Sequence, residues 1–481
     1  MTKTKIPVSL PYPEPTEAYW QTPPHALSDH RTTPTLPPST KYAIIGSGIT
    51  GAITAFKLLQ LEPSASILLL EARQACSGAT GRNGGHCRAG RYLEFKTYLE
   101  QFGRDEALRM ERLEEENVKL VGEFVREHGI ECDLRDVETL DIFTDEMKWG
   151  KALDALETRK SVLEGEVERS VLVKHRVWSR EETRNELLIP DGVGAISYPA
   201  HALNPYRLVC RILEMCIEKG MNLQTNTPVL EVEQSSSRGS SKYWTVHTER
   251  GDIRAEKVVL ATNAYSSVLY PPLTEFLIPT RAQVAAIRPG SNIVDNPALK
   301  RTMGLESSIS GDYMQSRAER SSGAGDIIIG GGRRLGTPLG NQGEQPVLDD
   351  TIIHPRISEY LTHAAATYFG RENWGEDGNV LQEWTGIMGY TLDSQPIVGE
   401  APGQDGLWIC VGFNGHGMAL TFRSAEALVQ LMIGRGKEVD EWLPRNYRIE
   451  RIRRMTMSTT CTRRRVGGYL HLEPHVRRAI D

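Results

Sequence analysis

The pattern of apolar and polar residues is most regular between Lys41 and Cys87, where it predicts a strand, a helix and a second strand in succession. Apolar side chains fill positions 42–45, recur at helical spacing over positions 49–59, and fill positions 67–70. Glycine-rich junctions follow both predicted strands. The pattern indicates a strand–turn–helix–strand unit, which is typical of a doubly wound α/β sheet.

The first junction reads Gly46-x-Gly48-x-x-Gly51, and each glycine has its own physical role. Gly46 permits a tight turn, Gly48 lets the backbone approach a pyrophosphate, and Gly51 lets the helix pack closely on the sheet. The phosphates would lie at a helix N-terminus, where free N–H groups and the helix dipole favour anions. Glu71 ends the second strand, where a carboxylate accepts hydrogen bonds from a ribose and repels a 2′-phosphate. The unit predicts an adenine dinucleotide and by itself leaves NAD and FAD both open.

The rest of the chain alternates between helical and strand patterns. Helices are predicted over 98–128, 147–163 and 205–219. Strands are predicted over 138–145, 223–232, 243–248, 257–260, 283–287 and 326–329. The segment 330–336 carries two arginines after a strand, but helix-breaking residues follow it, so we expect a plain turn there rather than a second dinucleotide loop.

The length of 481 residues favours two domains over one. Residues 1–40 contain nine prolines and no helical or strand period, so they are predicted to form an extended arm that Tyr19 and Trp20 could pin to the body. Dinucleotide-type segments recur far apart in the sequence. This spacing indicates a discontinuous domain, with the intervening chain folded as a cap.

Composition and charge exclude several classes of protein. A net charge of −6 provides no global positive field for nucleic acid. The seven cysteines lack paired spacing, so neither a disulfide framework nor a metal site is expected. No signal-peptide or membrane-spanning pattern is present, which predicts an intracellular, cytoplasmic protein. Arginines cluster after position 444, and a solvated tail explains them as well as an anionic partner does.

Three further motifs follow the Gly46 unit in a fixed order. They are the loop 77–85 (SGATGRNGG), the segment 261–265 (ATNAY), and a C-terminal pair formed by 384–399 (WTGIMGYTLDSQPIVG) and 412–418 (GFNGHGM). Together they resemble the D-amino-acid-oxidase-type FAD-dependent oxidoreductases, close to the gamma-glutamylputrescine oxidase and sarcosine oxidase branch, over residues 41–440.

The resemblance implies an α/β fold in which a discontinuous Rossmann-like FAD-binding domain carries an α+β substrate domain with a mixed antiparallel sheet. The implied FAD domain comprises residues 41–90, 199–278 and 376–440. The substrate or cap domain comprises residues 91–198 and 279–375. The proline-rich arm at 1–40 and an arginine-rich tail at 441–481 complete the chain.

The resemblance also assigns the residues that would hold FAD. The pyrophosphate would face Gly46, Ser47, Gly48 and Gly51, and the adenosine would face Glu71, Arg73 and Val229. The path from the phosphates to the flavin ring would be lined by Thr80, Arg82, Asn83, Gly84 and Gly85. The pyrimidine edge of the isoalloxazine would meet Asn414, Gly415, His416, Gly417 and Met418. A reduced flavin gathers negative charge at this edge, and the N–H groups of a turn that opens a helix suit that charge.

Three residues after the phosphate-type loop are the catalytic candidates. Arg91 is predicted to anchor a substrate carboxylate, because a guanidinium binds it bidentately, and Arg88 is predicted to lie against the flavin. A surface position is the alternative for both arginines. His86 could be a pocket base, could be bonded covalently to the flavin, or could be an ordinary buried histidine. His416 is expected to fix its turn rather than to move protons.

The implied reaction is oxidation of a C–N bond of a small-molecule amine or amino acid to an imine, by hydride transfer to FAD and with O2 as the acceptor that yields H2O2. Met388 stands where monomeric sarcosine oxidases hold the flavin through a cysteine, so we expect noncovalent FAD. No lysine occurs in 326–329, where that branch has the lysine that assists oxygen, so a dehydrogenase with another acceptor stays open. The alternatives are a tailoring enzyme for a larger secondary-metabolite amine and a flavin-bearing sensor or scaffold.

Overall fold

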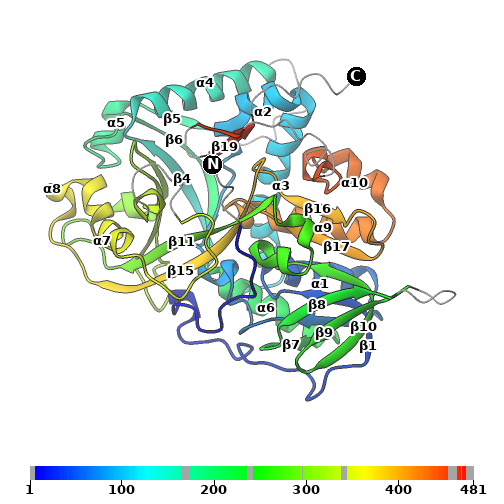
Figure 1. Cartoon of the computed structure of the whole chain (residues 1–481). Helices are drawn as coiled ribbons and strands as arrows, with labels where there is room; N and C mark the ends of the chain where they lie inside the picture. Colours follow the sequence, from blue (N-terminus) through cyan, green and yellow to red (C-terminus); the bar gives the residue numbers. More distant parts are fainter. Residues whose placement is uncertain are drawn as a thin grey trace.

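The computed structural model describes residues 6–163, 174–235, 242–294, 296–336 and 344–452, together with the backbone of two short strands, β18 (Arg463–Val466) and β19 (Tyr469–Leu472). Two large sheets dominate these residues, with helices around both (Figure 1). Each sheet is built from segments that lie far apart in the sequence, because the chain passes between the sheets several times.

The first sheet is a mainly parallel sheet centred on β1, which pairs in parallel with β2 and β10. A hairpin of β8 and β9 extends β10. Its strands, in order across the sheet, are β16 (Ile397–Glu400), β17 (Leu407–Val411), β10 (Gly251–Leu260), β1 (Ser39–Ile45), β2 (Ile67–Leu70) and β7 (Asn222–Gln224), with β8 (Val229–Gln234) and β9 (Trp244–Thr248) beside β10.

The alternation of side chains in β1 explains how this sheet is covered. Tyr42 and Ile44 belong to the core beneath three helices, α1 (Ile49–Leu61), α6 (Pro205–Glu218) and α9 (Gly417–Met432). Ala43 and Ile45 point the other way, into the core shared with β8 and β9. Both faces are therefore buried, as expected for a parallel strand that is apolar at every position.

The second sheet is mainly antiparallel, and its one parallel pair joins β4 to β12. Its strands, in order, are β15 (Val380–Thr391), β11 (Leu277–Ile287), β14 (Ile327–Gly330), β13 (Gly311–Ser316), β12 (Thr302–Glu306), β4 (Arg135–Phe143), β6 (Gly194–Ala202) and β3 (His86–Cys87), with β5 (Arg176–Trp178) on β6. This arrangement matches the predicted α/β fold with a mixed second sheet.

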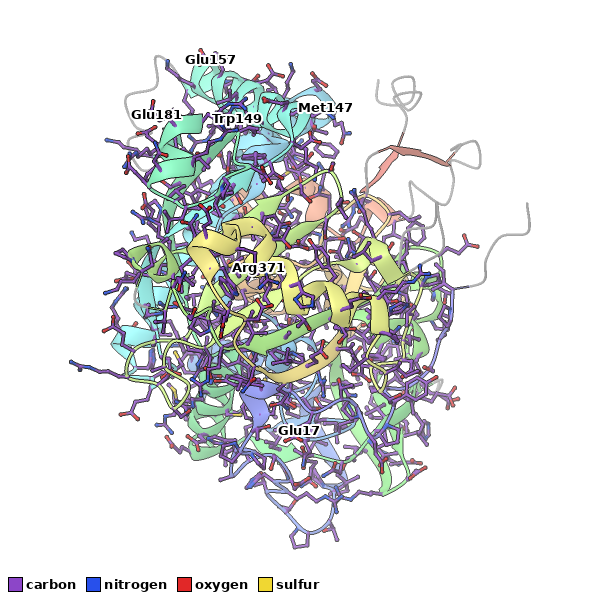
Figure 2. All side chains as sticks on the ribbon, turned by 90° about the vertical axis from the view of Figure 1, so that its left-hand side faces the viewer. Glu17, Met147, Trp149, Glu157, Glu181 and Arg371 are labelled. Carbon is purple, nitrogen blue, oxygen red and sulfur yellow. The ribbon has the colours of Figure 1, made fainter. Side chains whose placement is uncertain are left out.

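Among the described residues, six helices pack around the second sheet and connect it to the first sheet. They are α2 (Phe95–Phe102), α3 (Arg104–Glu127), α4 (Glu146–Leu163), α5 (Arg180–Asn185), α7 (Pro355–Phe369) and α8 (Arg371–Trp374). Helix α3 packs on α9, which covers one face of the first sheet, and so connects the two sheets. Figure 2 shows Met147, Trp149 and Glu157 of α4 at the end of the molecule opposite Glu17 of the N-terminal arm. No helix among the described residues is long and apolar enough to cross a bilayer.

Two local predictions differ from the structure for identifiable backbone reasons. The helix predicted over 98–128 is interrupted at Gly103, whose φ of +82° ends α2 and begins α3. The strand predicted over 223–232 is two strands, because Asn226 takes a φ of +48° between β7 and β8. β15, which lies within the segment 376–440, pairs with β11 in the second sheet. The segment 330–336 ends in a short 3₁₀ turn (Arg333–Gly336), as expected of a plain turn.

The chain after α10 (Gly436–Trp442) is not the solvated tail that its arginines suggested, as far as residue 452. Tyr447 and Ile449 are fully buried in the body of the protein. Arg451 forms an ion pair with Asp393, with 2.6 Å between Nε and Oδ2. Apolar residues between the arginines cause this packing. Arg453, Arg454 and the side chains of 463–465 lie outside the described residues.

Candidate functional site

One continuous cavity of about 1760 Å³ runs between the two sheets. Its wall includes the Gly46 turn and Val229 from the first sheet, and Tyr313 and Tyr390 from the second. Pockets for a single small ligand are about 300–1,000 Å³. The cavity therefore has room for a large cofactor and a substrate together.

The glycines of the first turn occupy the positions that a phosphate cradle requires. Gly46 has a φ of +106°, and a Cβ there would lie 2.8 Å from the carbonyl oxygen of Ala261. A Cβ at Gly51 would lie 1.9 Å from the carbonyl oxygen of Gly46, so only glycine lets α1 approach the turn. A Cβ at Gly48 would meet only the Thr80 side chain, at 3.0 Å, on the wall of the cavity. Gly48 therefore leaves open the space that a pyrophosphate needs.

Glu71 braces the turn and faces the same cavity. Its Oε2 accepts hydrogen bonds from the backbone N–H of Ser47 at 2.9 Å and from the Ser47 hydroxyl at 2.7 Å. Its Oε1 accepts one from the backbone N–H of Arg73 at 3.0 Å. A carboxylate oxygen accepts more than one hydrogen bond, so Glu71 can hold the turn and still receive a ribose hydroxyl.

Three predicted cofactor residues lie behind the cavity wall rather than on it. Ser47 is fully buried, and its hydroxyl accepts a hydrogen bond from the backbone N–H of Cys76. Gly51 lies under the turn, as its close approach to Gly46 requires. Gly85 has a φ of +75°, and a Cβ there would lie 2.4 Å from the carbonyl oxygen of Leu203. These residues shape the cradle without facing its occupant.

Two predicted cofactor arginines have guanidinium groups that are held by the chain itself. Arg73 forms a buried ion pair with Asp350, with 3.0 Å between NH1 and Oδ2. Arg82 donates to the carbonyl oxygens of Ser77, Thr385 and Thr16 at 2.6–2.7 Å. Burial, with the nearby charge of Arg73, lowers the pKa of Arg82 to about 10, so it stays protonated at neutral pH. Both side chains line the cavity, but these contacts hold them in its wall.

The turn before α9 forms the opposite end of the cofactor site. Asn414 has a φ of +54°, and its side chain accepts from the Thr391 N–H at 2.8 Å and donates to the Gly412 carbonyl at 2.6 Å. Gly415 follows with a φ of +82°, and α9 begins at Gly417. The first N–H groups of a helix lack intrahelical partners. This end therefore offers donors to negative charge in the cavity.

The imidazoles at the site are weak bases. Both ring nitrogens of His86 are buried, and its ring lies edge-on to Tyr313 with 5.3 Å between centroids. Burial and the positive charge of Arg88 lower the pKa of His86 to about 3. Enclosure and the charges of Arg91 and Arg88 also lower the pKa of His416, whose side chain is 42% exposed toward the cavity. A general base acts best with a pKa near the working pH, so the pocket-base role predicted for His86 is disfavoured.

Arg88 lies on the cavity wall with its charge already balanced. Its NH1 lies 2.5 Å from Oδ1 of Asp141, a carboxylate that is 1% exposed. The hydroxyls of Tyr92 and Tyr198 donate to the other oxygen of Asp141, at 2.6 Å and 3.0 Å. Because every oxygen of Asp141 is bonded, the pair is held in one geometry.

Arg91 is also on the wall, but its partners are weaker. Its NH1 donates to the Tyr98 hydroxyl at 3.0 Å and to the side chain of Gln395 at 3.3 Å, and its guanidinium stacks over the rings of Tyr98 and Tyr447. The nearest carboxylate belongs to Glu114, at 3.9 Å from Nε. Among the described residues, Arg91 thus keeps one buried donor, its Nε, without an acceptor.

Sequence reasoning missed the acidic residues behind the arginines. Glu114 occurs within the apolar stripe of α3, between Met110, Leu113 and Val121, and is 1% exposed. A carboxylate within an apolar stripe was the available signal. Asp141 was hidden in an alternating strand, where nothing local distinguishes an inward acid from an outward one.

Comparisons with known proteins agree with this geometry. A family model described as FAD dependent oxidoreductase (DAO) matches residues 41–431. Probable oxidoreductase OrdL of Haemophilus influenzae is 22% identical over 403 residues, which cover 81% of this chain and 82% of that protein. Gamma-glutamylputrescine oxidoreductase of Escherichia coli is 21% identical over 402 residues, with coverage of 82% and 84%. The solved structure of L-proline dehydrogenase from P. horikoshii shares the fold, with a TM-score of 0.65 and 19% identity over 87% of this chain and 99% of that chain.

The substitution Gly48→Val tests the phosphate cradle. The added side chain would occupy the space beside Thr80 that the pyrophosphate needs, so we expect the purified variant to lose bound FAD. The measurement is the ratio of flavin to protein absorbance after reconstitution with excess FAD. Gly150→Val, at a glycine of α4 with open space around it, is the control. Full FAD content in Gly48→Val would show that the turn does not hold phosphate.

Glu114 gives a testable pH dependence of stability. Burial raises its pKa from 4.5 to about 7, although the Arg91 guanidinium opposes the shift. The folded protein therefore binds more protons than the unfolded chain between these values, so the free energy of unfolding falls as pH rises through that window.

Glu114→Gln should remove this fall, which we expect to be on the order of 1–3 kcal/mol. The measurement is urea unfolding at pH 5, 6 and 7, with the exposed Glu123→Gln on the same helix as control. Equal pH slopes for Glu114→Gln and the unsubstituted protein would contradict the assignment.

Proposed function

The chain belongs to the family of FAD-dependent oxidoreductases, and from this premise we propose that it oxidises the C–N bond of an amine or amino acid to an imine. The observation that carries the proposal is the joining of two sites in one cavity. The glycine cradle and the turn before α9 suit the cofactor, and Arg91 suits an anionic substrate beyond them. Relatives named for gamma-glutamylputrescine and for L-proline support an amine or amino acid as the substrate class.

FAD, when bound, supplies the acceptor for the two electrons and the hydrogen that leave the substrate carbon as hydride. The substrate nitrogen loses a proton, and the resulting imine is hydrolysed by water. Only a neutral amine can donate hydride in this way. Arg88 and Arg91 stay protonated beside the cavity, while His86 and His416 stay neutral. The positive charge of Arg91 disfavours an ammonium group nearby and so favours the reactive form of the substrate.

Arg91 is proposed as the anchor for a substrate carboxylate. It keeps its charge, it faces the cavity, and its nearest carboxylate is 3.9 Å away. Arg88 is paired with Asp141 at 2.5 Å, so its charge is balanced within the wall and it is not proposed as the substrate anchor. An anchored carboxylate fixes the position of the carbon that loses hydride.

We further propose that the cofactor is noncovalent and that O2 is its oxidant. Burial raises the pKa of the Cys87 thiol, so the reactive thiolate is disfavoured, and Met388 cannot form the link expected of a cysteine. O2 takes up two electrons and two protons and leaves as H2O2. Flavin that passes a filter after acid denaturation would support noncovalent attachment, and flavin retained on the chain would contradict it.

The proposed reaction is tested by anaerobic mixing of the holoenzyme with a panel of primary amines, secondary amines and amino acids. We expect at least one compound to bleach the oxidised flavin absorbance, and air to restore it with one H2O2 per O2 consumed. Chemical reduction by dithionite is the control for an accessible flavin. A flavin that dithionite bleaches and no amine bleaches would contradict amine oxidation. Turnover with artificial acceptors and not with O2 would identify a dehydrogenase.

Arg91→Ala tests the anchor. A charge-assisted bidentate contact contributes about 1.5–3 kcal/mol, so we expect kcat/KM for carboxylate-bearing amines to fall by roughly one to two orders of magnitude. Amines without a carboxylate serve as matched substrates and should change little. Arg91→Lys should retain part of the activity, because lysine keeps the positive charge but cannot form the bidentate pair of hydrogen bonds to a carboxylate. Equal losses for both substrate classes would contradict the anchor and favour a larger amine as the substrate.

A further inference from the structure

We propose that the N-terminal arm is part of the FAD site, and that residues 10–22, the strap, close the adenosine end of the cavity and retain the cofactor. The strap passes beside β15 of the second sheet, and the arm then reaches the first sheet (Figure 1). It contacts the phosphate loop, residues 77–85, along the way. The strap precedes the segment in which the cofactor motifs occur, so none of those motifs includes it.

The first part of the strap forms a wall of the cavity itself. Leu10 and Pro11 line the same cavity as Glu71 and Arg73, and the next residue, Tyr12, contacts Arg73 at the end assigned to the adenosine. The carbonyl oxygen of Tyr12 accepts a hydrogen bond from NH1 of Arg73 at 3.1 Å, which fixes this wall two residues beyond Glu71. An apolar wall at this position would bury the adenine on one side and reduce its exposure to water.

Thr16 anchors the middle of the strap to the second sheet and to the phosphate loop. Its backbone N–H donates to the Asp350 carbonyl at 2.8 Å, and its hydroxyl accepts from the Thr385 N–H at 2.9 Å. Its carbonyl oxygen accepts from NH2 of Arg82 at 2.6 Å. Arg82 lies within the phosphate loop, so Thr16 connects the strap directly to the segment that lines the cofactor path.

The last part of the strap contacts both the phosphate loop and the second sheet. The Trp20 indole, 4% exposed, donates to the Asn83 carbonyl at 2.6 Å. The Tyr19 hydroxyl donates to Asp326 at 2.6 Å, and its ring stacks near Trp384 with 6.4 Å between centroids. Gln21 donates to the Gly81 carbonyl at 3.3 Å. The loop is therefore held by the strap on one side and by β15 on the other.

The composition of the arm suits this role. Prolines restrict the backbone of the arm already in the unfolded chain. Less conformational entropy is therefore lost when the segment packs over the cavity. The arm continues to Arg31, which bridges to Gln224 of β7, and then enters β1 at Ser39. The strap is thus connected to the strand that ends at the Gly46 turn, and a bound cofactor would lie between the two.

The test compares FAD binding by three forms of the full-length protein: unsubstituted, Leu10→Ser and Val8→Ser. Leu10 lines the cavity, whereas Val8 is 43% exposed on the same arm and is absent from the lining, so Val8→Ser is the matched control. A fourth form lacks residues 1–13 and retains Thr16, Tyr19 and Trp20. FAD affinity and release rate are measured by flavin fluorescence, and the melting temperature of the FAD-free protein is measured beside them.

We expect Leu10→Ser to weaken FAD binding severalfold and the truncation to weaken it roughly tenfold or more, the factor that corresponds to about 1.4 kcal/mol. Val8→Ser should bind normally, and the FAD-free proteins should melt at equal temperatures. FAD affinity and release unchanged in the truncated protein would overturn the proposal. A loss of affinity matched by an equal loss of stability in the FAD-free form would also overturn it, because the strap would then support only the fold.

Discussion

The structure depends on a buried guanidinium that forms no ion pair with any carboxylate among the described residues. Arg82 is 3% exposed, and its donors reach carbonyl oxygens of the phosphate loop, the strap and β15. Removing a charge from water is costly unless hydrogen bonds replace the lost hydration. Three segments that lie far apart in the sequence must therefore meet around this one side chain. The cofactor path is positioned as a consequence, because the loop that carries Arg82 lines it.

Arg88 and Arg91 are also buried charges that need polar partners, but their partners include carboxylates. Asp141 neutralises Arg88 and is itself fixed by two tyrosine hydroxyls, so this pair behaves as a rigid part of the wall. Breaking a buried pair of this kind costs about 3–5 kcal/mol. Glu114 stands farther from Arg91, and its raised pKa shows that burial outweighs the attraction of the guanidinium. Arg88 is thus paired closely with a carboxylate, whereas Arg91 is held mainly by a tyrosine hydroxyl and an amide oxygen.

The two halves of the molecule meet where these charges lie. Helix α3 packs on α9 and carries Glu114 on its buried face, while the turn that begins α9 lines the cavity. Asn117 of α3 donates to the Met418 carbonyl at 3.0 Å and accepts from the Arg423 N–H. Helix α3 therefore contacts both the Arg91 region and the turn that begins α9.

The sequence alone determined the parts of the protein that are set by local backbone chemistry. The glycine spacing at 46–51, the acid at Glu71 and the turn at 412–418 predicted the cofactor site, because φ angles and close approaches leave few residues that fit. It also predicted that Tyr19 and Trp20 would pin the arm, and both are bonded to the body. Only the tertiary structure decided that Arg88 is paired with Asp141, that His86 is a poor base, and that Leu10 lines the cavity. Those properties depend on burial and on partners brought from distant segments, which no local pattern of residues records.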